Sequence, residues 1–284
     1  MKKITLLLLL STTYIFSNIN AIVSILPQQT FLKAIGGDKV NIVLMVQPGN
    51  SPHTYEPKPS QMMAIAHADL YFAIDVEFEH TWLLKFQSLN ANMHIVDIAD
   101  GVKKMHMTQA HNEHDTHGEH AHAGEDPHIW TAPNNVEIIA KNIYDALSKY
   151  DSLNAPYYKK NLDTFLASVD ETDKQIREIL SSLNKSRSFM VFHPSWGYFA
   201  KAYDLDQIAV EVEGKSPKPR ELVMLIKEAK EEKVNAIFTQ PEFSDSAAKI
   251  IANELHIPVV KISPMAPNWS ENLIHMAKTI AGQH

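Results

Sequence analysis

The sequence predicts an α/β protein of two similar lobes, each a roughly four-stranded parallel sheet flanked by helices, joined by one long rigid backbone helix. Three observations predict this class. Short apolar runs alternate with stretches of helical periodicity, which is the pattern of βα units in a parallel sheet. Each half of the chain holds four such runs. Between the halves lies a helical stretch longer than a typical globular helix.

The N-terminus has the layout of a secretory signal peptide. Met1-Lys2-Lys3 is a positively charged start, Ile4–Leu10 is an apolar run, and Asn20-Ala21 offers a small residue for cleavage. The apolar run is short for a membrane span, so an uncleaved anchor is the alternative. We expect residues 1–21 to be removed and the mature protein to be periplasmic. The chain has no cysteine, so we expect no lipid anchor.

The first lobe is expected over residues 22–150, including a His-rich loop at 105–126. Its strands are predicted at Ala21–Leu26, Val40–Val46, Asp69–Ile74 and His94–Ile98. Helices are predicted at Gln61–Ala68, Thr81–Leu89 and Asn134–Tyr150, the last with Asn134 as its candidate cap.

The linking helix is expected over residues 151–184. Asn154 and Pro156 open it, because Pro is favourable at an early helical position. Apolar side chains recur at helical spacing as far as Leu183. About 28 residues at 1.5 Å each would reach roughly 40 Å, enough to run the length of a two-domain body. A helical pair inside one domain is the alternative.

The second lobe is expected over residues 185–284 and repeats the plan of the first. Its strands are predicted at Ser188–Phe192, Gln207–Glu211, Asn235–Thr239 and Pro258–Ile262. Its helices are predicted at Lys218–Glu231, Ser244–Leu255 and Glu271–Ala281. The formal net charge of the whole chain is −7, which argues against nucleic acid as a partner, since phosphate binding needs a basic face.

A dense histidine tract lies between Met105 and Trp130. This tract holds seven of the fifteen histidines of the chain. Such a tract is typical of metal contact, because neutral imidazole is a leading ligand for Zn²⁺, Cu²⁺ and Ni²⁺. The candidate accessory ligands in the tract are His106, His111, His114, His117, His120 and His122. A solvated polar loop that binds metal only incidentally is the alternative.

Three histidines have unusual surroundings. His53 lies in a stiff, proline-rich loop after the strand expected at Val40–Val46, and His193 directly follows another expected strand. His128 ends the tract in the segment DPHIW. In open α/β sheets, ligands bind beyond the carboxyl ends of the strands, and neighbouring prolines limit where an imidazole can go. Each histidine alone would more often be structural, but the three together point to a metal site.

Five stretches spread over the mature chain carry a family resemblance. They are SPHTYEPKPSQ, the His-rich loop leading into DPHIWTAP, MVFHPSWGYFAKAYDL, EVEGKSPKPREL and IFTQPEFS. The chain resembles the substrate-binding proteins of zinc/manganese ABC importers, in particular the periplasmic zinc-binding type with a histidine-rich loop. The resemblance implies metal in the cleft between the lobes, with His53, His128 and His193 as ligands. It also implies an ABC permease and its ATPase in the inner membrane as partners, and we expect a monomer.

One position departs from the family pattern. Family members often carry an acid near the last strand, in a segment resembling LDPLG, where this chain has Ser263. A hydroxyl is a poor ligand for Zn²⁺, so the fourth ligand stays open. Water is the first choice, since zinc tolerates three protein ligands plus water. A histidine or acid of the loop is the second, and Glu271 is the third.

Three imidazoles without a carboxylate favour Zn(II) over Mn(II), which prefers oxygen ligands. We expect capture of Zn²⁺ in the cleft and delivery to the permease, gated by the loops that carry His53 and His128. The tract at 106–122 would collect metal near the cleft. The alternatives are a manganese-binding or adhesin-type member of the fold, a periplasmic zinc buffer and a zinc hydrolase. The motifs HExxH and HxxEH are absent from the sequence, so we expect no enzyme.

Overall fold

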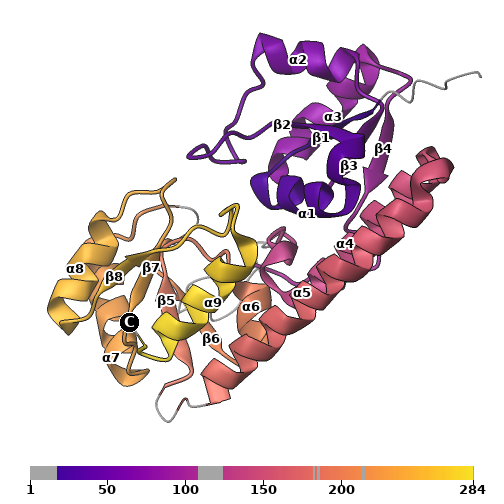
Figure 1. Cartoon of the computed structure of the whole chain (residues 1–284). Coiled ribbons are helices and arrows are strands. Elements are labelled where there is room, and N and C mark those ends of the chain that lie inside the picture. Colours follow the sequence, from indigo (N-terminus) through magenta and orange to yellow (C-terminus); the bar gives the residue numbers. More distant parts are fainter. Residues whose placement is uncertain (1–17, 108–123, 182, 184–185, 213–214, 284) are drawn as a thin grey trace, which may run out of the picture.

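The computed structural model describes residues 18–107, 124–181, 183, 186–212 and 215–283. Two lobes are connected by the long helix α5 (Ala155–Ser181), which runs diagonally along both of them in Figure 1. Each lobe holds a four-stranded sheet, and every strand pair is parallel, with orders β2-β1-β3-β4 and β6-β5-β7-β8. The predicted class of two α/β lobes joined by one long helix is confirmed.

The first lobe is built around the strands β1 (Ile19–Val23), β2 (Val40–Leu44), β3 (Leu70–Ala73) and β4 (His94–Asp97). Its helices are α1 (Leu26–Gly36), α2 (Pro59–Ala66), α3 (Glu77–Leu89) and α4 (Pro133–Tyr150). We did not predict α1, because the first apolar run was extended to Leu26. The sequence signal for this helix is Pro27, since proline near a helix start is favourable. The strand β1 ends at Val23, three residues before α1 begins at Leu26.

The first strand also bears on the expected signal peptide. β1 begins at Ile19, which pairs with Val40, and the Asn20 N–H donates to Asp69 Oδ2 at 2.8 Å. Cleavage after Ala21 would remove these contacts, so the structure favours a cleavage point upstream of the predicted one. Residues 1–17 of the expected leader lie outside the described residues.

The second lobe is built around β5 (Ser188–Val191), β6 (Asp206–Ala209), β7 (Ile237–Thr239) and β8 (Val259–Lys261). Its helices are α6 (Gly197–Ala202), α7 (Pro219–Glu231), α8 (Ser246–Leu255) and α9 (Trp269–Ile280). Three short 3₁₀ turns precede α5 in the chain: η1 (Gly37–Lys39), η2 (Ile129–Thr131) and η3 (Ser152–Asn154). The six-residue α6 went unpredicted, because it is too short to show a helical period.

The predicted cap of α4 was wrong. The helix begins at Pro133 with Ala132 in the capping position, and the Asn134 side chain donates to Asn135 Oδ1 at 3.2 Å instead. The fixed φ of proline is preorganised for the first helical position, so the helix starts one residue before the expected asparagine.

The long helix is fixed to both lobes. In the first lobe, Asn161 of α5 donates to the Ile35 carbonyl at 3.0 Å. In the second, Tyr203 donates to Asp173 of α5 at 2.9 Å. One buried apolar cluster runs from the first sheet across α5 to α9, and a smaller one fills the outer part of the second lobe. None of the described helices is long and apolar enough to cross a bilayer.

Candidate metal centre

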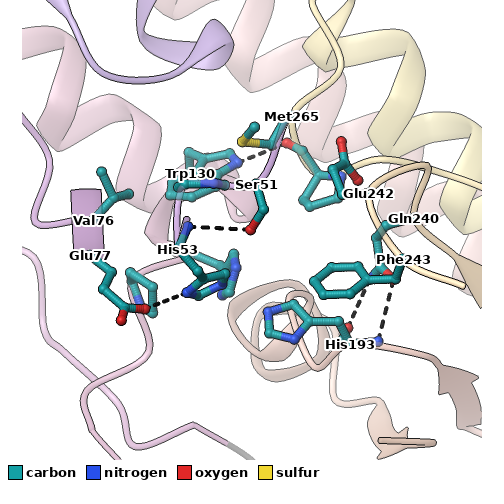
Figure 2. Close-up of a pocket in the computed structure, with 14 residues that line it drawn as sticks. Ser51, His53, Val76, Glu77, Trp130, His193, Gln240, Glu242, Phe243 and Met265 are labelled. Carbon is teal, nitrogen blue, oxygen red and sulfur yellow. Dashed lines mark hydrogen bonds and ion pairs between the residues drawn. The ribbon is translucent and has the colours of Figure 1, made fainter. Parts of the chain in front are cut away.

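The structure brings His53, His128 and His193 together in one pocket between the lobes (Figure 2). The ring centroids of His128 and His193 are 5.4 Å apart, and those of His53 and His193 are 5.5 Å apart. The walls come from segments that follow β2, β3 and β4 in the first lobe and β5, β7 and β8 in the second. The pocket thus lies beyond the carboxyl ends of parallel strands in both sheets, as the general rule for open α/β sheets predicts.

Each of the three imidazoles contacts one carboxylate through Nδ1. The pairs are His53 with Glu77, His128 with Asp126 at 2.7 Å, and His193 with Glu211 at 2.8 Å. A carboxylate in this position accepts a hydrogen bond from Nδ1–H, which fixes the tautomer and leaves the Nε2 lone pair for a metal. Carboxylate–histidine pairs of this kind are the usual support of metal-ligating histidines.

His193 is buried, as is His128. Its ring stacks on Phe243 with centroids 4.8 Å apart, and both the histidine and Glu211 are buried. The Nε2 atom of His193 is buried and has no hydrogen-bond partner among the described residues. A buried polar nitrogen without a partner costs about 1–3 kcal/mol, and coordination of a cation is one way to remove that cost.

The segment that carries His128 is bonded to the second lobe. Asp126 accepts from the backbone N–H of His128 at 2.9 Å, and its carbonyl accepts from Tyr198 at 3.0 Å. The Trp130 indole donates to the Pro264 carbonyl at 2.8 Å. His128 and His193 therefore belong to one rigid frame, although the segment that carries His128 precedes the long helix in the sequence.

His53 differs from the other two ligand candidates in its exposure. Its side chain is 32 % exposed, and that of its partner Glu77 is 59 % exposed. Its backbone N–H donates to Ser51 within the same loop at 3.3 Å. His53 and Glu77 also line a second, neighbouring pocket, at the base of the His-rich tract. His53 is the ligand candidate that can move with the least disturbance.

The ring spacing is close to that of a bound ion. Two imidazoles on one tetrahedral zinc, with Zn–N distances near 2.0–2.1 Å, have centroids roughly 5 Å apart. As the side chains stand, no group of three His, Asp or Glu in the described part of the chain has the geometry to hold a metal ion. Small ring rotations, above all of the exposed His53, are therefore needed before all Nε2 atoms converge.

Carboxylates surround the pocket, and no Lys or Arg from the described residues lines it. Sequence reasoning did not single out Glu77, Glu211 or Glu242 as site residues. The signal for Glu242 was its place just after the strand β7. Of the expected fourth ligands, Glu271 lies exposed in the first turn of α9 and does not line the pocket.

The expected accessory ligands fall outside this pocket or outside the described residues. His106 forms an isolated β-bridge with Glu125 at the base of the tract and does not line the pocket. The remaining five, which lie outside the described residues, are His111, His114, His117, His120 and His122.

The fold and the pocket together define a class: a two-lobed binding protein with a small histidine-lined pocket between its lobes. Residues 22–283 match the family described as "Zinc-uptake complex component A periplasmic", and the chain belongs to this family, ZnuA. The family comprises extracytoplasmic substrate-binding proteins of transporters rather than enzymes.

Known proteins of this kind are similar over most of the chain. A crystal structure of ZnuA superposes with a TM-score of 0.85 at 40% identity, over 93% of this chain and 98% of that one. The metal ABC transporter substrate-binding lipoprotein SloC of Streptococcus mutans is 29% identical over 239 residues, 80% of this chain and 74% of SloC. The zinc-binding protein AdcA of Streptococcus pyogenes is 27% identical over 264 residues, 87% of this chain, which spans only 50% of AdcA.

Proposed function

We propose that this protein is the solute-binding component of a zinc ABC importer, which captures Zn²⁺ between its lobes and delivers it to a membrane permease and its ATPase. The observation that carries the proposal is that three imidazoles line one pocket, each with a carboxylate on Nδ1. Membership in the zinc-uptake family and the similarity to zinc-binding AdcA support it. A relative named as a manganese transporter component, PsaA of Streptococcus anginosus, is 27% identical, so Mn²⁺ is the alternative metal.

The three histidines divide the work of capture. His128 and His193 form a fixed pair in the frame of the second lobe, and His53 closes on the ion from the first lobe. Zinc accepts tetrahedral geometry without a preference from its d-electrons, and imidazole is a ligand that suits it. The contacts of Asp126 with Tyr198 make the His128 loop a poor gate. We therefore assign the opening and closing of the site to the His53 loop alone, and no longer to the two loops that carry His53 and His128.

The setting of the protein follows from the same proposal. The chain works in the periplasm after export, without a lipid anchor, because it contains no cysteine. SloC, by contrast, is named as a lipoprotein. The tract at 106–122 collects metal at low affinity. Met107 and Gly124 line a second pocket together with His53 and Glu77.

The test is a zinc titration of the metal-free mature protein against a competing chelator. The wild type is expected to show one tight site plus weaker sites, and a His53/His128/His193 triple alanine variant is expected to keep only the weaker ones. His67→Ala is the matched control, because His67 is an exposed histidine just after α2 that bonds to the Met63 carbonyl. Unchanged tight binding in the triple variant would move the metal chemistry to the tract and favour zinc buffering.

A further inference from the structure

One carboxylate in the pocket stands apart from the three histidine–carboxylate pairs. Glu242 lies on the loop after β7 and lines the same pocket as the three histidines, across from Glu77 (Figure 2). Glu77, Asp126 and Glu211 each bond to one imidazole. The hydrogen bond of Glu242 in the described part of the chain comes from Ser263 instead. In the part of the chain that the structure describes, no ion pair involves Glu242. Its charge is therefore not balanced by a cation of the protein.

Ser263 holds this carboxylate in place. The Ser263 hydroxyl is 3.3 Å from Glu242 Oε1 and accepts from the Met265 backbone N–H at 3.1 Å. The hydroxyl thus accepts from the backbone and donates its own proton to Glu242. A neutral donor orients a carboxylate without cancelling its charge, and the second oxygen of Glu242 stays available to a cation.

The sheet register explains why these two residues meet. β7 and β8 are parallel neighbours in which Thr239 pairs with Lys261. Glu242 follows Thr239 by three residues, and Ser263 follows Lys261 by two, so both leave the sheet at the same edge. This edge is the one beyond which ligands bind in open α/β sheets. An acid on the loop after the adjacent strand thus lies beside Ser263, where the sequence left the fourth ligand open.

We propose that Glu242 supplies the oxygen ligand that completes the coordination of the captured ion, with Ser263 as its positioning residue. The inference rests on the proposed capture of a divalent metal by the three histidines. Glu242 is half-buried on a loop, so its second oxygen approaches the ion without opening the core, while Oε1 keeps the hydrogen bond from Ser263. The added carboxylate brings an oxygen ligand, which suits Mn²⁺ better than Zn²⁺. Glu242 is therefore expected to matter more for Mn²⁺ than for Zn²⁺.

The first arm of the test measures affinity. Zn²⁺ and Mn²⁺ are titrated separately into metal-free wild type and Glu242→Gln, which removes the charge and keeps the size. Loss of a supporting group around a metal ligand costs about 10–100-fold in affinity, so loss of the ligand itself is expected to weaken Zn²⁺ binding at least about 10-fold, and Mn²⁺ binding by more. Glu271→Gln is the matched control, since it changes the charge equally on an exposed turn outside the pocket.

The second arm reads the ligand set directly. The visible spectrum of the Co²⁺-loaded protein is expected to differ between wild type and Glu242→Gln, and a Glu242→Gln/Ser263→Asp double variant is expected to recover affinity by returning an acid to the same edge. An affinity and spectrum of Glu242→Gln that match both wild type and Glu271→Gln would overturn the role of Glu242. Retention of the tight site in the triple histidine variant would instead overturn the proposed function, so the two failures are distinguishable.

Discussion

Replacement of Glu79 by glutamine is expected to remove a large part of the pH dependence of stability. Glu79 lies in the first turn of α3 and is fully buried. Its carboxylate accepts from Ser24 Oγ, from the Ile74 N–H at 3.0 Å and from the Asp75 N–H at 2.7 Å. Burial raises the pKa of this carboxyl from 4.5 to about 7, although the hydrogen bonds favour the charged form and lower the pKa in part.

The sign and the size follow from this pKa. The folded state holds the proton up to about pH 7, whereas the unfolded chain releases it near 4.5. Glu79 therefore adds stability that is fully present below pH 4.5 and is lost as the pH rises to about 7. At about 1.36 kcal/mol per pKa unit, the gap between 4.5 and 7 corresponds to roughly 3 kcal/mol in the free energy of unfolding.

The assay is denaturant unfolding of metal-free wild type and Glu79→Gln between pH 4.5 and 8. Glutamine keeps an oxygen for the two N–H donors and cannot ionise. Between these pH limits, the wild type is expected to lose roughly 3 kcal/mol relative to the variant as the pH rises. Protonation of the histidines is shared by both proteins and cancels in the difference. Parallel stability profiles would refute the assignment of a protonated Glu79 below neutral pH.

Three further predictions concern the site and the N-terminus. Glu211→Gln weakens the hydrogen bond with His193 Nδ1. The Zn²⁺ affinity measured in a chelator competition is therefore expected to fall about 10–100-fold. Gly197→Ala would place a Cβ 2.9 Å from Asp126 Oδ2, so that the backbone or this carboxylate must shift, and the disturbed contact with His128 is expected to weaken Zn²⁺ binding in the same assay. The intact mass of the exported protein is expected to show that Ile19 is retained, because it begins the first strand.

Each of these outcomes has a clear opposite. Unchanged Zn²⁺ affinity in Glu211→Gln would show that orientation of the ring does not limit binding. Gly124→Ala is the matched control for the second prediction, since a Cβ there meets nothing within 4 Å, and equal losses in both alanine variants would point to a general effect. A mass that begins at Ile22 would mean that the sheet forms without the first three residues of β1.

The fold was predictable because local patterns carry it. Buried parallel strands read as continuous apolar runs, and the amphipathic repeat of α5 marked the connecting helix over nearly its observed length. The exceptions arose where the local signal competes with its neighbours. The helix α4 begins at Pro133, before the asparagine that was expected to cap it. The helix α1 begins at Leu26, which the apolar pattern assigned to the end of a strand.

The candidate site was only partly predictable, for a physical reason. The rule on strand ends and the proline-rich surroundings singled out His53 and His193. Their carboxylate partners come from other elements, Glu77 from α3 and Glu211 from the segment just after β6. No spacing in the sequence links such partners, because they meet only when the sheet and both lobes assemble. The role of the histidines as metal ligands stays a prediction.

The attachment of α5 to both lobes has a consequence for protein engineering. Because one apolar cluster runs from the first sheet across α5 to α9, a chain truncated on either side of this helix would expose a wide apolar face. The lobes are therefore not interchangeable modules, and a chimera of relatives with different metal preference should exchange the loops at the strand ends instead. Selectivity can then change by a few residues while the framework is left intact.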